Sequence, residues 1–225
     1  MIRSGPSHWI GLLSPSWARL LRSRPNRNKG LEANSLRHFF LPNRVKFGEL
    51  EVFESLGRPS RMQIEESLQS IVQTTSKLFW KLFYLQASVK RFSYNFRKLH
   101  EISGIIDFID GVQGSLTISF PEKTALELVG RLCKKPCLEV NATVIDGIGE
   151  IANLICGNSK AELSKKNHGN PIQFSIPHVI IGRNYLISHP RGVQSMAAHF
   201  ESDFGKFLVE LSLKTKEWIG HKERE

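Results

Sequence analysis

A carboxylate and a carboxamide stand three residues apart in the segment DGIGEIANLICG, at positions 146 to 157. At about 100° per residue, a helix places four residues of this segment within about 60° of one another: Asp146, Glu150, Asn153 and Gly157. An asparagine amide donates and accepts hydrogen bonds without ionising, and a glutamate forms charge-assisted bonds to cations. The segment therefore predicts a polar helix face that could bind or orient polar groups.

Gly157 is the informative member of this polar face. Glycine inside a helix costs about 1 kcal/mol relative to alanine, and one use of bare backbone on an exposed face is to let another surface come close. Gly147 and Gly149 add to this cost. The opposite side of the helix should be buried, since it carries Val144, Ile145, Ile148, Ile151, Ala152 and Ile155. Geometry alone leaves a docking face and an ordinary solvated helix face both open.

Three helices are predicted around these residues. Apolar residues at helical spacing predict a first helix over about 62–82. Pro121, at a first helical position, opens a second helix over EKTALELVGRLC. Thr143 followed by Asp146 matches a capping box, so the third helix should begin there and run to about Lys166.

Seven strands are predicted from alternating apolar residues and turn signals. They are expected at 83–92, 103–110, 114–120, 174–183, 185–190, 193–200 and 205–214, with a hairpin turn at 201–205. Strands joined by tight turns must be antiparallel. Each half of the chain is a helix followed by a strand meander, which suggests an α+β domain with a mainly antiparallel sheet, three helices and an internal pseudo-repeat.

The run D-x3-E-x2-N-x3-G, followed by Lys160, resembles the signature helix of the CheC, CheX and FliY family of chemotaxis phosphatases. Three flanking segments are similar to CheX in particular: GIIDFIDGVQGSLTISFPEKTALELVGRL, IPHVIIGRNYLISHPRGVQ and FESDFGKFLVELSLK. The resemblance covers about residues 62–215 and implies a CheC-like fold.

The resemblance also implies an activity and a partner. Such a protein hydrolyses the aspartyl phosphate of a response regulator such as CheY. By position, Asn153 would orient the attacking water, Glu150 would pair with a lysine of the partner, and Asp146 and Gly157 would contribute to docking. The chain would need no cofactor of its own, because the response regulator would bind Mg²⁺. A homodimer built partly by sheet pairing between subunits is also implied.

The same resemblance leaves two alternatives open. One is a non-catalytic module of this fold that docks a response regulator or another partner without hydrolysing a phosphate. The other concerns copy number, since CheC-type members carry two signature motifs and CheX-type members carry one. The first helix offers Glu66 and Gln69 as an E-x-x-Q pair, but Gln73 stands where the motif has glycine.

The formal charge of +10 suggests a nucleic-acid partner, but most of the excess lies near the start. Residues 1–60 carry ten Lys and Arg against four Glu, a surplus of six, so the other 165 residues share four. We interpret 1–61 as a basic, poorly ordered extension, either transit-peptide-like or a start assigned ahead of Met62. Residues 216–225 form a polar tail.

A second basic stretch interleaves its charges with aromatic residues from Lys77 to Lys98. This pattern is typical of single-stranded nucleic-acid binding. It also fits a helix end that runs into an edge strand, with aromatic residues inward and lysines on the open edge. We favour the edge strand.

Cysteine, histidine and apolar content exclude other classes. Cys133, Cys137 and Cys156 lack zinc-ribbon or disulfide-framework spacing, so we expect no metal site and a reducing cytoplasmic setting. No apolar run approaches the length of about 18 residues that a membrane span needs. The loop from His189 to Gly192 is either a turn after a strand or the position of an acid–base histidine, and the turn is the commoner explanation.

Overall fold

The computed structural model describes residues 58–95, 98–110, 112–166 and 171–214. Its helices in these ranges are α2 (Arg58–Phe83), α3 (Glu122–Cys133) and α4 (Ala142–Lys166). Its strands there are β1 (Ser88–Tyr94), β2 (Ile102–Asp110), β3 (Gly114–Phe120), β4 (Gln173–Phe174), β5 (His178–Ile181), β6 (Val193–Ser202) and β7 (Gly205–Lys214). Most of the expected extension and the whole polar tail lie outside the described residues. None of the described helices is long and apolar enough to cross a membrane.

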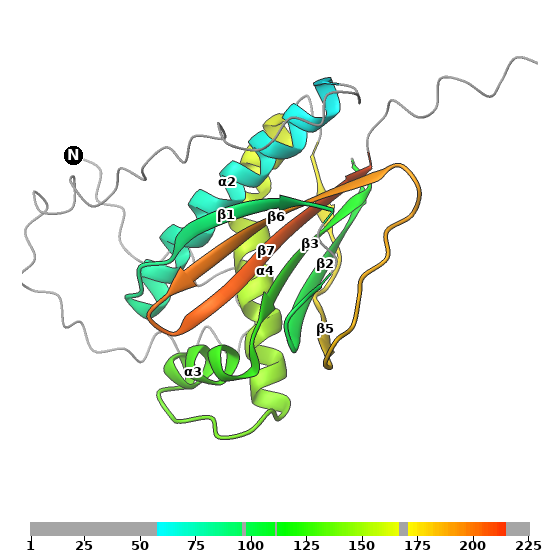
Figure 1. Ribbon diagram of the computed structural model, residues 1–225. Coiled ribbons are helices and arrows are strands. Elements are labelled where there is room, and N and C mark those ends of the chain that lie inside the picture. Colours follow the sequence, from blue (N-terminus) through cyan, green and yellow to red (C-terminus); the bar gives the residue numbers. More distant parts are fainter. Residues whose placement is uncertain (1–57, 96–97, 111, 167–170, 215–225) are drawn as a thin grey trace, which may run out of the picture.

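The described strands form one sheet in the order β1-β6-β7-β3-β2, and both β4 and β5 pair with the outer side of β2. Every pairing among them is antiparallel. The long helices α2 and α4 lie on one face of this sheet, with α3 near one end (Figure 1). The first half of the chain supplies β1, β2 and β3, and the second half supplies β5, β6 and β7. Strand β1 pairs with β6 as β5 pairs with β2, and β6 pairs with β7 as β2 pairs with β3, so the two halves are arranged alike. The α+β class and the antiparallel sheet are confirmed, and the strand order reflects the expected pseudo-repeat.

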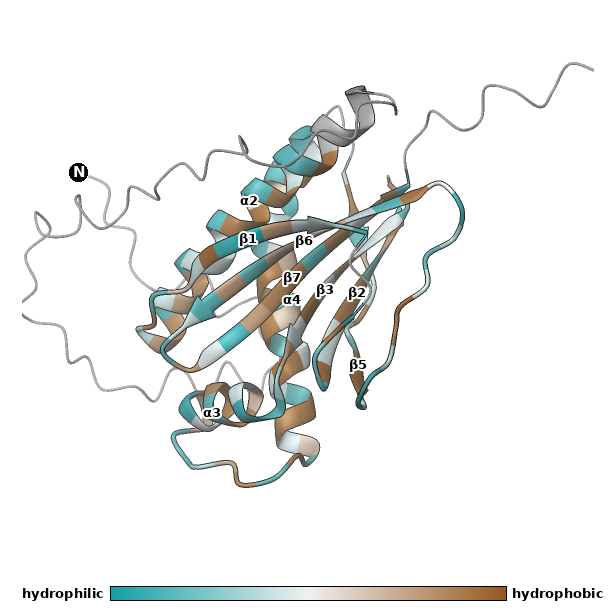
Figure 2. Cartoon of the chain, in the orientation of Figure 1, coloured by the Kyte–Doolittle hydropathy of each residue, from teal (hydrophilic) through white to brown (hydrophobic). Residues whose placement is uncertain are grey.

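Aromatic stacking fixes α2 to the middle of the sheet. The Phe207 ring on β7 stacks on Phe79 of α2, with centroids 4.6 Å apart, and on Phe200 of β6 at 4.7 Å. Phe120 of β3 adds a tilted contact at 5.4 Å. All four side chains are buried. Hydrophobic residues, brown in Figure 2, recur along the central strands and along α4. Burial of large apolar side chains is the main stabilising contribution here.

Close approach of α4 to its neighbours depends on glycine at two positions. A Cβ atom on Gly104 of β2 would lie 3.0 Å from the Ala152 Cβ and 3.2 Å from the Ile148 carbonyl oxygen. A Cβ atom on Gly147 would lie 2.8 Å from both methyl groups of Val129 on α3. The helix therefore sits directly on β2 and against α3, and Gly147, which seemed only costly in the sequence, has a packing role.

Four predicted boundaries differ from the structure at the helix ends and the first strand. Helix α2 begins at Arg58 rather than 62, and Pro121 is the residue before α3 rather than its first helical residue. The expected capping box is wrong, because α4 begins at Ala142 and Asn141 Oδ1 accepts the Val144 N–H at 3.2 Å. Strand β1 begins at Ser88, since the chain leaves α2 through Tyr84 in a left-handed conformation (φ 56°).

The predicted strands at 174–183 and 185–190 also need correction. Pro177, which has no N–H to donate, stands in the gap between β4 and β5. Residues 185–190 form a strap across the sheet, joined to it by an isolated bridge between Lys98 and Leu186. Alternate residues of the strap are half-buried against the sheet: Tyr185, Ile187 and His189. The alternation in sequence therefore reflects packing on a sheet face rather than strand pairing.

Candidate functional site

The four residues of the predicted polar face lie on one side of α4. Asp146 is exposed, while Glu150, Asn153 and Gly157 are partly buried. The opposite side of the helix is in the core, with Val144, Ile148, Ile151, Ala152 and Ile155 all buried and Ile145 partly buried. We call Asp146, Glu150, Asn153 and Gly157 the α4 stripe. It is a narrow, partly open strip, and the other residues between Val144 and Gly157 are buried or partly buried.

Glu150 carries the unusual feature of the α4 stripe. Its Oε2 atom is buried, and no group in the described part of the chain donates a hydrogen bond to it. A buried carboxylate oxygen without a donor is costly. The arrangement favours a cation or an N–H donor supplied by a bound molecule.

Asn153 lies one turn beyond Glu150 on a helix that cannot easily shift. The close contacts at Gly104 and Gly147 fix α4 in position against β2 and α3. A site built on a rigid helix holds its side chains more accurately than one built on loops. The helix therefore holds the Asn153 amide and the Glu150 carboxylate in fixed positions relative to each other.

The α4 stripe has a wall along one flank. A Cβ atom on Gly149 would lie 3.4 Å from the Pro177 ring, and the Lys160 ammonium lies 5.7 Å from the centre of the Phe174 ring. The segment from Phe174 to Pro177 therefore runs beside α4. Nothing in the sequence pattern alone placed this segment next to the stripe, because the contact joins residues from different elements.

The E-x-x-Q pair of α2 is in a different environment. Glu66 Oε2 lies 3.4 Å from Lys166 Nζ, so a cation of the chain already faces this carboxylate. Gln69 and Gln73 are exposed. The pair therefore does not reproduce the partly buried carboxylate of α4.

The basic aromatic stretch shows the features of the edge-strand interpretation. Strand β1 is at the edge of the described sheet and pairs with β6. Phe79 and Phe83 are buried as this interpretation expects, whereas Trp80 and Tyr84 are exposed. Lys90 on β1 forms an ion pair with Glu201 at 3.4 Å. Phe96 and Arg97, which belong to the same stretch, lie outside the described residues.

The three cysteines are free thiols. Cys156 is buried on the core side of α4, and burial raises the pKa of its thiol well above the ordinary value. Burial, with a contribution from nearby Cys137, also raises the pKa of Cys133. Among the described residues, no group of three or more His, Cys, Asp and Glu is placed to hold a metal ion.

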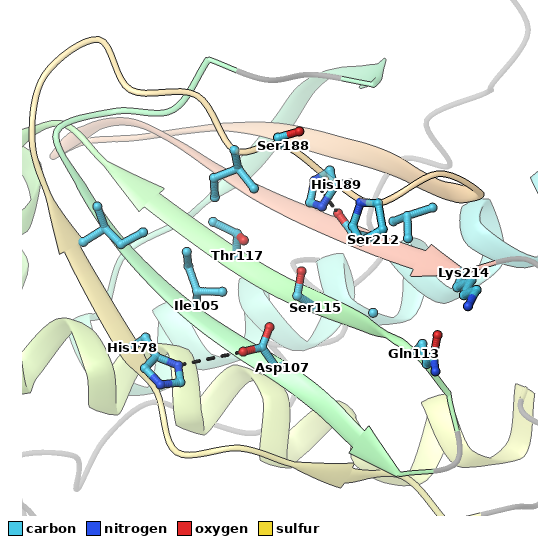
Figure 3. Close-up of a pocket in the computed structure, with 15 residues that line it drawn as sticks. Ile105, Asp107, Gln113, Ser115, Thr117, His178, Ser188, His189, Ser212 and Lys214 are labelled. Carbon is cyan, nitrogen blue, oxygen red and sulfur yellow. Dashed lines mark hydrogen bonds and ion pairs between the residues drawn. The ribbon is translucent and has the colours of Figure 1, made fainter.

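A second candidate is an open cleft of about 510 Å³ on the sheet face turned away from the helices (Figure 3). Ser115, Thr117 and Ser212 line its floor, and apolar walls come from residues such as Ile105 and Ile187. Sequence reasoning missed this cleft, because the strap that closes one side was interpreted as a strand. The sequence did contain a signal for the cleft: Ser115 and Thr117 stand at alternate positions of β3, so one face of that strand carries small side chains.

The histidine of the 189–192 loop lies at this cleft. His189 Nε2 is 3.1 Å from Ser212 Oγ and 3.7 Å from Glu210 Oε1. In a nucleophilic triad the carboxylate orients the imidazole through the other ring nitrogen. Here Ser212 and Glu210 both lie closest to the same ring nitrogen, Nε2 of His189, and Ser212 is buried. These three residues therefore do not form a nucleophilic triad.

Glu210 is 1% exposed, and burial raises the pKa of its carboxyl to about 7. The Ser195 hydroxyl is close enough to lower that pKa in part. The cleft is thus backed by a buried acid, whereas the α4 stripe is on the helix side of the sheet. The two candidates are separate, and in the stripe a partly buried carboxylate, Glu150, lies one helical turn from the amide of Asn153.

Comparison with solved structures defines the class of this domain. A CheC-like superfamily protein from Shewanella sp. PV-4 aligns with a TM-score of 0.61 and 22% identity, over 67% of this chain and 98% of that one. CheX from Desulfovibrio desulfuricans aligns with a TM-score of 0.59 and 24% identity, over 66% and 99%. These likenesses establish a CheC-like fold.

The family model described as chemotaxis phosphatase CheX matches residues 102–201. That range includes the whole α4 stripe, and over it the chain is similar to CheX, as the sequence resemblance indicated. CheX of Borrelia burgdorferi, solved in a complex with CheY, BeF₃ and Mg²⁺, shares the fold at a TM-score of 0.52 and 20% identity, over 66% and 98%. A comparison with curated proteins gave no match.

Proposed function

We propose that this protein hydrolyses the aspartyl phosphate of a CheY-like receiver domain. One observation carries the proposal: Glu150, whose buried Oε2 accepts no hydrogen bond from the described residues, lies one turn from Asn153 on a rigid, partly open helix face. The match to the CheX phosphatase family and the likeness to a CheX solved with CheY support it.

The chemistry asks little of the phosphatase beyond positioning. Phosphoryl transfer depends mainly on orientation and charge stabilisation, and side-chain amides orient attacking water in other phosphoryl-transfer enzymes. The Asn153 amide would accept a hydrogen bond from the water and donate one to a phosphoryl oxygen. Fixing one water in line removes part of the entropic barrier.

Glu150 has a separate role in this proposal. A lysine of the receiver would donate to the carboxylate, and this charge-assisted bond would both dock and align the partner. Removal of the cation-binding oxygen should therefore weaken binding as well as rate. Asp146, exposed one turn before Glu150, and Gly157, one turn beyond Asn153, would lie at the margins of the contact.

Magnesium is expected on the receiver rather than on this chain. The solved complex from B. burgdorferi contains Mg²⁺ together with CheY. The chain would contribute carboxylate and amide groups to the water and the lysine, with no metal-dependent step of its own. We also propose a cytoplasmic homodimer formed partly through an open sheet edge, which the molar mass from light scattering would test.

The decisive experiment follows phosphate loss from CheY phosphorylated with acetyl phosphate and Mg²⁺. Addition of the wild-type chain should accelerate the loss, and Glu150→Ala should reduce kcat/KM by about 10- to 100-fold. Glu66→Ala, which removes the matching carboxylate on α2, is the control and should retain wild-type rates. Binding of CheY without any acceleration of phosphate loss would contradict the enzymatic function and indicate a docking module of the same fold.

A further inference from the structure

The wall beside the α4 stripe has a definite direction. Pro177 contacts α4 at Gly149, and Phe174 lies under Lys160, eleven positions later on the helix. The segment therefore runs antiparallel to α4. Since α4 advances about 1.5 Å per residue, the backbones of Gly149 and Lys160 are separated by about 16 Å along the helix axis, and the long Lys160 side chain reaches back from its turn to Phe174.

Ile176 comes between these two contacts in the chain. It therefore lies alongside the part of α4 that begins at Gly149 and includes Asn153. Gly149, Asn153 and Lys160 fall on the same flank of the helix at about 100° per residue. An isoleucine is thus placed beside the turn that presents the amide of the α4 stripe.

The position of Ile176 is held by its neighbours. Ser175 donates its backbone N–H to the Asp107 carbonyl oxygen at 2.9 Å, and its hydroxyl oxygen accepts the Asp107 N–H at 3.0 Å. Pro177 packs on the other side against Gly149. The Ile176 side chain nevertheless remains 78% exposed. A large apolar side chain that is held in place and open to solvent is available to pack against the surface of a partner.

We propose that Ile176 is an apolar contact residue for the receiver domain, at the rim of the surface that surrounds its phosphorylated aspartate. This inference rests on the proposed function. The neighbouring face of α4 carries two carboxylates, Asp146 and Glu150, against one lysine, Lys160, a balance that disfavours a nucleic acid as the occupant. A protein surface with a lysine, a polar centre and an apolar neighbour fits the carboxylate, amide and isoleucine together.

The contact should contribute to binding and not to the chemical step. Ile176→Ser is expected to raise the KM for phosphorylated CheY about tenfold, as the loss of a largely buried isoleucine contact predicts, with kcat unchanged within about twofold. Ile176→Leu should keep the wild-type KM. Since the residue is exposed, these variants should fold normally.

The control is Leu186→Ser, because Leu186 is 66% exposed on the strap, which crosses the face of the sheet opposite α4. The full-length chain would be assayed with CheY phosphorylated by acetyl phosphate and Mg²⁺, and binding to beryllofluoride-treated CheY would be measured in parallel. A raised KM for Ile176→Ser alone supports the contact. An active wild type with an unchanged KM for Ile176→Ser overturns this inference and leaves the proposed function standing. A wild type that neither binds nor dephosphorylates CheY overturns both.

Discussion

Gly147 of α4 and Val129 of α3 meet so closely that a Cβ atom on the glycine would lie 2.8 Å from both valine methyl groups. Gly147→Ala should therefore destabilise the protein, even though alanine favours a helix by about 1 kcal/mol. Overpacking of this kind costs about 1 to 3 kcal/mol, so we expect a net loss of about 1 kcal/mol. Urea unfolding followed by circular dichroism would measure it, and equal or higher stability would show that α3 can yield.

Gly157 gives the opposite expectation on the same helix. It is partly exposed, so Gly157→Ala should keep or raise the free energy of unfolding, by at most about 1 kcal/mol. If the receiver approaches the bare backbone there, the same variant should raise the KM for phosphorylated CheY. An unchanged KM would mean that Gly157 is not part of the docking surface. A loss of stability would mean that the added methyl group does not fit.

Glu210 predicts a dependence of stability on pH. Its pKa rises from 4.5 to about 7 on folding because of burial. The folded state is therefore favoured fully below about pH 4.5, and this stability is lost as the pH rises through about 7, a change of about 3 kcal/mol. His189, 3.7 Å away, is the titratable group that faces it.

Glu210→Gln should remove this loss, because the amide does not ionise. The difference in unfolding free energy between variant and wild type should then grow from pH 4.5 to 8 in favour of the variant. Glu127→Gln, at an exposed position on α3, should show no such trend. A constant difference across this range would mean that His189 or another group compensates for the charge.

The start of α4 gives a direct comparison between two candidate caps. Asn141 Oδ1 accepts the Val144 N–H, so Asn141→Ala should cost about 1 kcal/mol of stability. Thr143→Ala, which removes the residue that the sequence pattern suggested, should cost less because Thr143 is exposed and within the helix. A larger loss of thermal stability for Thr143→Ala than for Asn141→Ala would show that Thr143 is the capping residue after all.

The part of this protein that follows from local periodicity could be predicted from its sequence. The α4 stripe and the buried residues opposite it depend only on helical spacing, and the order of helices and strands depends on turn signals and alternation. The cap was misplaced because Asn141 and Thr143 are both good N-cap residues, and only the backbone conformation decides between them.

Features that depend on contacts between distant segments could not be predicted. The strap alternates like a strand because every second side chain packs on the sheet, and the sequence does not distinguish that from pairing. The outer cleft exists only because the strap crosses β3 and β7. Likewise, the course of residues 174–177 beside α4 depends on contacts of Pro177 and Phe174 with that helix, which no single segment reveals.

The most direct test of the account is the pair of measurements on Asn153→Ala: binding to beryllofluoride-treated CheY, and the rate of phosphate loss from phosphorylated CheY. We predict that the variant binds within about threefold of wild type but loses about 100-fold or more of the acceleration, since removal of a single positioned group typically costs this much. Gln69→Ala, which removes an exposed amide from α2, should behave as wild type. Acceleration by Asn153→Ala equal to that of the wild type would contradict the central claim that this amide orients the attacking water.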